Sequence, residues 1–91
     1  MARSTRFLYS ANVSETRFES IQKKLALNIR RRREELGLTQ EDVAHASGIA
    51  VRHYQKLESG ELNVTVRTLA KVAVALECEL FEFFAAQEKN D

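Results

Sequence analysis

The segment TQEDVAHASGIAVRHYQKLESG, from Thr39 to Gly60, constrains the fold of this chain more than any other stretch. Thr39 is a good helix N-cap, and Asp42 stands three residues later, where its carboxylate can complete a capping box. The short helix that this predicts ends at Gly48, where a sharp turn requires a positive φ. A second short helix is expected from about residue 50 to 59. The segment therefore predicts two short helices joined by a tight turn, the second with a polar outer face.

Helical patterns continue on both sides of this segment. Ser14 can cap a long first helix, with a break near Ser20 as an alternative, and Gly37 can end it in a left-handed conformation. The apolar residues of this helix fall on nearly one stripe: Phe18, Ile21, Leu25, Ile29 and Leu36. Thr65 is the expected cap of a further helix with inward-facing Val66, Leu69, Ala73 and Leu76. A last helix is expected from about 80 to 87.

The composition favours one all-α domain. The chain has 91 residues, no Pro and only three Gly, which disfavours a turn-rich β architecture. Residues 1–13 show no helical period and are expected to form an arm. A flexible terminus, a basic arm that reaches DNA and an apolar strip on a partner subunit remain open for this arm. Residues 14–88 then form the folded domain, and residues 89–91 are a tail.

The charges are distributed unevenly. Residues 1–33 carry nine basic side chains against two acidic ones, a net charge of +7, whereas residues 34–91 carry five against eleven, a net charge of −6. The basic half suggests a polyanion as partner, with a solvated charged face as the alternative. The single Cys78 suits a reducing compartment, and no apolar run reaches the length of a membrane span. We therefore expect a cytoplasmic protein with no membrane association.

Two short helices joined at a Gly, the second polar on its outer face, are typical of a helix-turn-helix. The stretch IRRRREELGLTQEDVAHASGIAVRHYQKLESG, followed by NVTVRTLAKVAVAL, resembles the lambda-repressor-like, Cro/XRE type of DNA-binding domain. The likeness covers about residues 25–84 and implies a compact five-helix fold. It also implies an ion pair between Arg33 and Glu58 that ties the first helix to the third. The chain departs from the family pattern at Ala50, Tyr54, Val64 and Glu77.

The resemblance implies that the third helix enters the DNA major groove. Its outward-facing residues are then the base-contacting ones: Val51, Arg52, Gln55 and Lys56. Arg52 can bind guanine bidentately, which makes it the strongest candidate among them. Backbone phosphates are expected at the start of the second and fourth helices, where the contacting residues are Gln40, Asn63, Thr65 and Arg67. In the run from Arg30 to Arg33, only Arg33 is expected to point inward, and the other three to form a solvated face.

The C-terminal stretch LFEFFAA suggests a surface for a second copy of the chain. On an α-helix, Leu80, Phe83 and Phe84 lie together and can close the core. Phe81 and Ala85 are then left for a partner, so the predicted dimer interface comprises Phe81, Phe84 and Ala85. The alternative is that Phe81 also packs into its own domain.

These observations predict a sequence-specific, double-stranded DNA-binding transcriptional regulator that acts as a homodimer on an inverted-repeat operator. A phage-type repressor, a restriction-modification controller protein and an antitoxin-like autorepressor all remain open as its role. The alternative from another class is an adaptor or antitoxin-like partner that uses the same fold to bind protein. His45 and His53 lack evident partner ligands, so we expect no metal. Cys78 is interpreted as a small buried hydrophobe. No catalytic constellation or phosphate loop is evident, so we expect no enzyme activity, cofactor or small-molecule ligand.

Overall fold

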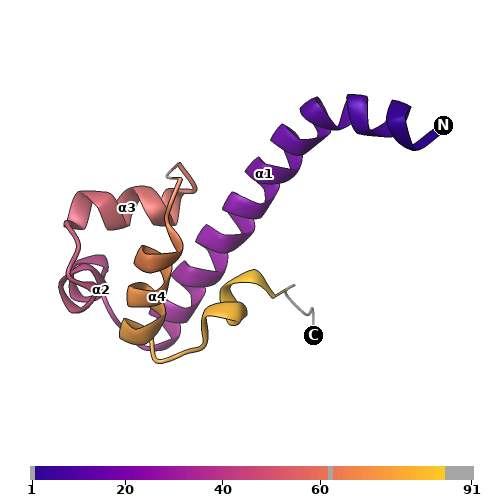
Figure 1. Ribbon diagram of the computed structural model, residues 1–91. Helices are drawn as coiled ribbons and strands as arrows, with labels where there is room; N and C mark the ends of the chain where they lie inside the picture. Colours follow the sequence, from indigo (N-terminus) through magenta and orange to yellow (C-terminus); the bar gives the residue numbers. More distant parts are fainter. Residues whose placement is uncertain (1, 62, 86–91) are drawn as a thin grey trace.

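The computed structural model describes residues 2–61 and 63–85, and all of its regular elements are helical over these residues. Figure 1 shows a long helix, α1 (Ala2–Glu35), beside three shorter ones, α2 (Gln40–Ser47), α3 (Val51–Ser59) and α4 (Val66–Ala75). A 3-10 helix, η1 (Leu80–Phe84), follows them. The expected all-α fold is confirmed, with four α-helices and a 3-10 helix in place of five α-helices.

The core lies where the C-terminal half of α1 meets the other helices. Helix α2 packs on α3 and α4, whereas α1 packs on α3 and η1. Fully buried side chains come from every element: Ile29, Val43, Ala44, Tyr54, Leu57, Val72, Leu76 and Phe83. Ala44 has no exposed surface, which fits the need for a small side chain where two helices cross closely.

Local sequence signals set the ends of the short helices. Thr39 adopts an extended conformation, and its side chain accepts a hydrogen bond from the Asp42 N–H while the Asp42 carboxylate accepts one from the Thr39 N–H. This capping box and the left-handed Gly48, at φ 71°, confirm the predicted bounds of α2. Thr65 caps α4 by accepting from the Thr68 N–H. Ala50 occupies the N-cap of α3 without a side-chain hydrogen bond.

Helix α1 corrects the prediction for the N-terminal residues. The expected non-helical arm over residues 1–13 is wrong for the described residues, because α1 begins at Ala2 and continues unbroken past Ser14 and Ser20. The N-terminal part of this helix projects away from the other helices (Figure 1). Phe18 and Ile21, near the middle of α1, are both exposed rather than buried.

The C-terminal segment corrects the expected position of Phe84. An α-helix would place Phe84 beside Phe83, but η1 is a 3-10 helix with about three residues per turn. Leu80 and Phe83 therefore share the inward face, where Phe83 is 1% exposed, and Phe81 and Phe84 share the outward face. Residues 86 and 87, the expected end of this helix, lie outside the described residues. In α4, Val66 is exposed, and Val72 takes a core position that the sequence pattern missed.

Candidate nucleic-acid interface

The centre of the candidate interface is the carboxylate of Glu58, which lies on α3 and is buried. Arg33 of α1 binds it bidentately, with Nε 2.6 Å from Oε2 and Nη2 3.1 Å from Oε1. The third guanidinium nitrogen of Arg33, Nη1, donates to the Leu38 carbonyl at 2.8 Å. The structure thus joins the first helix, the start of the turn into α2 and the end of α3 through one buried ion pair.

Two further groups donate hydrogen bonds to the same carboxylate. Tyr54 Oη donates to Oε2 of Glu58, and Gln40 Nε2 donates to Oε1 at 3.0 Å. Burial by itself raises the pKa of Glu58, but the hydrogen bonds from Arg33, Tyr54 and Gln40 outweigh it, so the pKa lies below its ordinary value. The ion pair also raises the pKa of Arg33, chiefly through its hydrogen bond to Glu58. Both groups are therefore charged at neutral pH.

The network extends from Gln40 to the outer face of α3. Gln55 Nε2 donates to Gln40 Oε1 at 3.3 Å, so the Gln40 side chain links the Glu58 carboxylate to a predicted base-contacting residue. Gln40 is the first residue of α2, at the helix end where backbone N–H groups point outward. The structure therefore couples the orientation of Gln55 to the packing of α1, α2 and α3.

Three of the four predicted base-contacting residues lie together. Arg52, Gln55 and Lys56 are exposed and line one open hollow on α3 of about 270 Å³, together with Ser59 and Glu61. Val51 is different, because its side chain is half-buried and packs partly against the core. The outer face of α3 thus presents two cationic groups and an amide to solvent, with an aliphatic side chain at its edge.

A neighbouring hollow on the same side contains Arg30, one of the arginines expected on a solvated face. Arg30 of α1 lines this space of about 380 Å³ together with Arg33, Gln40, Gln55, Glu58 and Ser59. Arg30 also forms an exposed pair with Glu34 at 3.2 Å. The sequence indicates this position, because Arg30 stands three residues before Arg33 and therefore lies on the same side of the helix.

The predicted phosphate-contacting residues beyond α3 lie on the connection to α4 and its first turn. Asn63, Thr65 and Arg67 are all exposed. The Thr65 hydroxyl already accepts the capping hydrogen bond from Thr68 N–H at 3.1 Å. Asn63 also borders an apolar hollow between α1, α4 and η1. Of these residues, Arg67 carries the cationic group.

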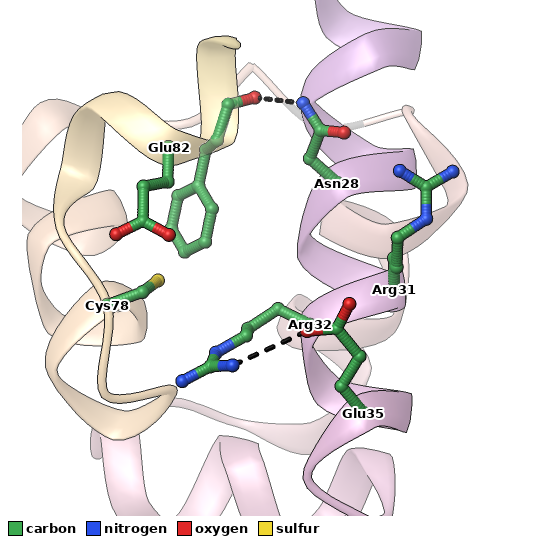
Figure 2. A pocket seen from close by; sticks show the side chains of 7 residues that line it. Asn28, Arg31, Arg32, Glu35, Cys78 and Glu82 are labelled. Atoms are coloured by element: carbon green, nitrogen blue, oxygen red, sulfur yellow. Dashed lines mark hydrogen bonds and ion pairs between the residues drawn. The ribbon is translucent and has the colours of Figure 1, made fainter. Parts of the chain in front are cut away.

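Away from Arg33, α1 also holds the C-terminal segment, through two side chains one helical turn apart. The buried Asn28 donates to the carbonyls of Phe83 at 2.7 Å and Ala85 at 3.1 Å. Arg32 donates to the carbonyls of Leu76 at 2.9 Å and Glu77 at 3.1 Å. Figure 2 shows both side chains reaching from α1 toward this segment. Arg32 is therefore not part of a solvated face, which corrects the interpretation of the arginine run.

The predicted dimer-interface residues are all accessible. Phe81 is 69% exposed and Phe84 is 47% exposed, and Ala85 is exposed beside them. Cys78 is half-buried between α4 and η1, where burial and then the nearby Glu82 carboxylate raise the pKa of its thiol. Among the residues that the structure describes, no three His, Cys, Asp or Glu side chains gather to hold a metal ion. Over the same residues, no helix has the length and apolar character needed to cross a bilayer.

This arrangement, with two short helices at a tight turn, a polar second helix and a buried ion pair behind it, defines a helix-turn-helix protein. A family model described as helix-turn-helix matches residues 29–83, and the chain belongs to this family. It is 43% identical over 56 residues to y4dJ of Sinorhizobium fredii, named an uncharacterized HTH-type transcriptional regulator. The aligned region spans 62% of this chain and 73% of y4dJ. The resemblance to Cro/XRE-type domains is thereby confirmed.

Two solved structures are similar in fold. The restriction-modification controller protein C.AhdI from Aeromonas hydrophila matches with a TM-score of 0.68 at 33% identity, over 69% of this chain and 96% of that one. A hypothetical transcription factor, NHTF, from Neisseria matches with a TM-score of 0.69 at 25% identity, over 71% of this chain and 75% of that one. The protein is therefore a member of a family of DNA-binding transcriptional regulators.

Proposed function

We propose that the protein binds double-stranded DNA sequence-specifically, as a homodimer, and regulates transcription. The observation that carries the proposal is the shared surface of Arg52, Gln55 and Lys56 on α3. A helix fits the major groove, where Arg can bind guanine O6 and N7 and Gln can bind adenine. Val51 stands at the edge of this surface and can pack against a thymine methyl group. Such a regulator works where the DNA is, in the cytoplasm.

Phosphate contacts would fix the orientation of α3 in the groove. Gln40 is the first residue of α2, whose N-terminal N–H groups suit a phosphate, and Arg67 lies in the first turn of α4. Asn63 and Thr65 stand beside Arg67 in the chain and complete this second group. Arg30 adds a cation beside Gln55 and Ser59. Phosphate contacts of this kind position a protein on DNA without reading its sequence.

The dimer is proposed because one recognition helix contacts too few base pairs to distinguish an operator from a genome's competing sites. The outward face of η1, with Phe81, Phe84 and Ala85, is the proposed contact surface. Large exposed aromatic side chains of this kind mark interaction sites. Likeness to y4dJ, which is named an uncharacterized HTH-type transcriptional regulator, supports a role in transcriptional control. The proposed operator is an inverted repeat.

A protein-binding adaptor is the second candidate function, because a fold alone does not establish a ligand. The observation that favours DNA over this candidate is the composition of the outer face of α3. Arg52 and Lys56 place two cations there, and Gln55 adds an amide that can donate and accept. An adaptor that binds an apolar partner would need an apolar surface at this position.

The test compares Arg52→Ala with Arg67→Ala. We expect Arg52→Ala to weaken the selected operator by roughly 1–3 kcal/mol and to relax preference at one base pair, since a bidentate base contact is lost. Arg67→Ala should weaken operator and random DNA by similar factors. Selection from random DNA followed by titration measures both effects. Equal losses on operator and random DNA for Arg52→Ala would remove Arg52 as a base-reading residue.

A further inference from the structure

A second apolar surface lies at the junction of α1, α4 and η1. Four large hydrophobic side chains that are exposed surround one hollow of about 210 Å³: Phe18, Ile21, Val66 and Phe84. Their exposed fractions run from 43% for Phe18 to 70% for Val66. The buried Leu25 and Leu69 also line it. Single exposed apolar residues are ordinary, but a cluster of four around a hollow marks an interaction site.

The side chains that line this hollow carry no charge, although 30% of the chain is charged. Asn63 and Gln22 are its polar members. DNA is a poor occupant, because phosphate binding depends on Lys and Arg. A two-fold symmetric interface instead disfavours charge. It brings the same patch of both copies together, so any charged residue near the axis faces the same charge on the other copy. An uncharged apolar patch therefore suits a second copy of the chain.

The position of Phe18 and Ile21 in the chain supports the same occupant. The family match begins at residue 29, so both side chains lie on the part of α1 that precedes the family domain. This part, residues 2–28, is about 40 Å long at 1.5 Å per residue. The apolar side chains of Phe18 and Ile21 on this part are uncovered, and a helix draws most of its stability from packing of its apolar residues. A partner that covers Phe18 and Ile21 supplies that packing.

We propose that this hollow is an interface between two copies of the chain, in which Ile21 and Phe18 pack against the partner's Val66 and the partner's Phe84. The inference rests on the homodimer of the proposed function and extends its surface from η1 onto α1. Phe84 connects the two parts, because it belongs both to the outward face of η1 and to the hollow. The part of α1 that precedes the matched residues 29–83 thus adds a dimerisation surface to the family domain.

The test compares Ile21→Glu with a matched control, Leu27→Glu. Both residues are 51% exposed on α1, but Ile21 lines the hollow and Leu27 does not. Sedimentation should show that Ile21→Glu raises the dimer dissociation constant more than about tenfold, because an unpaired carboxylate would be buried. Leu27→Glu should dimerise like the wild-type protein. Far-UV circular dichroism should show unchanged helix content in both variants.

A rescue experiment tests the pairing itself. Val66→Lys should also be monomeric, and mixing it with Ile21→Glu should restore dimers, since the two opposite charges meet across the interface. No restoration on mixing would overturn the contact between Ile21 and the partner's Val66.

Three other outcomes overturn the inference and separate its failure from that of the proposed function. If Ile21→Glu dimerises normally while Phe81→Glu is monomeric, η1 alone forms the dimer and the proposed function stands. If Ile21→Glu stays dimeric but loses DNA affinity, this face of α1 contacts DNA. If the wild-type protein is monomeric at tens of micromolar, both the inference and the proposed homodimer fail.

Discussion

The Glu58 carboxylate accepts hydrogen bonds from three side chains on three different helices: Arg33, Gln40 and Tyr54. Its side chain is 3% exposed and that of Arg33 is 13% exposed. A buried ion pair of this kind adds little net stability over a well-packed apolar pair, but removing one partner strands the other charge away from water. Its clearest consequence is geometric, because Gln40 carries the same network to Gln55 on the outer face of α3.

We expect Glu58→Ala to lower the free energy of unfolding by about 3 kcal/mol, because Arg33 would keep its charge without its partner. Urea denaturation measures this loss. Glu34→Ala is the control, since Glu34 forms an exposed pair with Arg30 and its removal should change stability by no more than about 0.5 kcal/mol. Equal unfolding midpoints for the two variants would contradict the structural role of Glu58.

The same residue makes stability depend on pH. The folded-state pKa of Glu58 lies below its ordinary value of 4.5, so its contribution is fully present above that value and is lost as pH falls through the lower folded-state pKa. The Asp42 carboxylate in the capping box has its pKa shifted the same way, by its hydrogen bonds with Thr39. Urea midpoints measured from about pH 7 to about pH 3 should therefore fall at the acid end. Glu58→Gln should show a shallower fall, and a slope equal to the wild-type slope would assign the dependence elsewhere.

At the scale of the element, the sequence predicts the helices whose ends are set by their own residues. Thr39, Asp42 and Gly48 define α2 through bonds that span only a few residues. The N-terminus of η1 is also set locally, by a capping box between Glu79 and Glu82, but Asn28 holds its C-terminal end by donating to carbonyls of Phe83 and Ala85 more than fifty residues away. No pattern within LFEFFAA carries that information, so an α-helix was the natural but wrong expectation.

The error at the N-terminus has another cause. Residues 2–13 lack an apolar period, but they also lack Gly and Pro. Once a helix is nucleated, extending it costs little, so α1 continues to Ala2 without an apolar stripe over its first residues.

The sequence predicts only part of the candidate interface. The resemblance supplied Arg33, Glu58 and the α3 residues, whereas the link from Gln40 to Gln55 and the position of Arg30 depend on how α1, α2 and α3 pack.

Helix α3 begins with an uncapped N-terminus, so adding a cap should stabilise the protein. Ala50 has the extended conformation of an N-cap, with φ −65° and ψ 144°, but no side-chain acceptor. Ala50→Ser should therefore stabilise the protein by about 1 kcal/mol through a hydrogen bond to a first-turn N–H of α3. Thermal unfolding measures the change. Ala46→Ser is the control, because Ala46 is exposed inside α2 and a hydroxyl there should give no gain; equal effects would show that no cap forms.

At the scale of the whole molecule, α1 connects the two surfaces to which the proposed function assigns different partners. Arg33 fixes the proposed DNA-binding side through Glu58, and Asn28 and Arg32 fix the C-terminal segment on another side. The three residues lie within two turns of one helix. The orientation of η1 relative to α3 is thereby set through α1, which is what a dimer needs if both recognition helices are to reach one face of DNA at a defined spacing.

The spacing of the two recognition helices determines the form of the operator. If a two-fold axis passes near the outward face of η1, selected DNA should contain an inverted repeat whose half-site centres are about 10–10.5 base pairs apart, or a multiple of that distance. Phe81→Glu should give folded monomers, because a carboxylate replaces a side chain that is 69% exposed in one copy and that the proposed dimer would cover. On the full operator this variant should bind no more tightly than on one half-site, whereas the wild-type protein should gain several kcal/mol from the second half-site, of the order that separates specific from non-specific binding. Gel-shift titrations on operators with one and two half-sites measure the difference.

Leu27→Glu, on the exposed surface of α1, should keep the wild-type preference for two half-sites. Two outcomes would contradict a two-fold axis near η1: selected sites without dyad symmetry, or a Phe81→Glu protein that still distinguishes two half-sites from one.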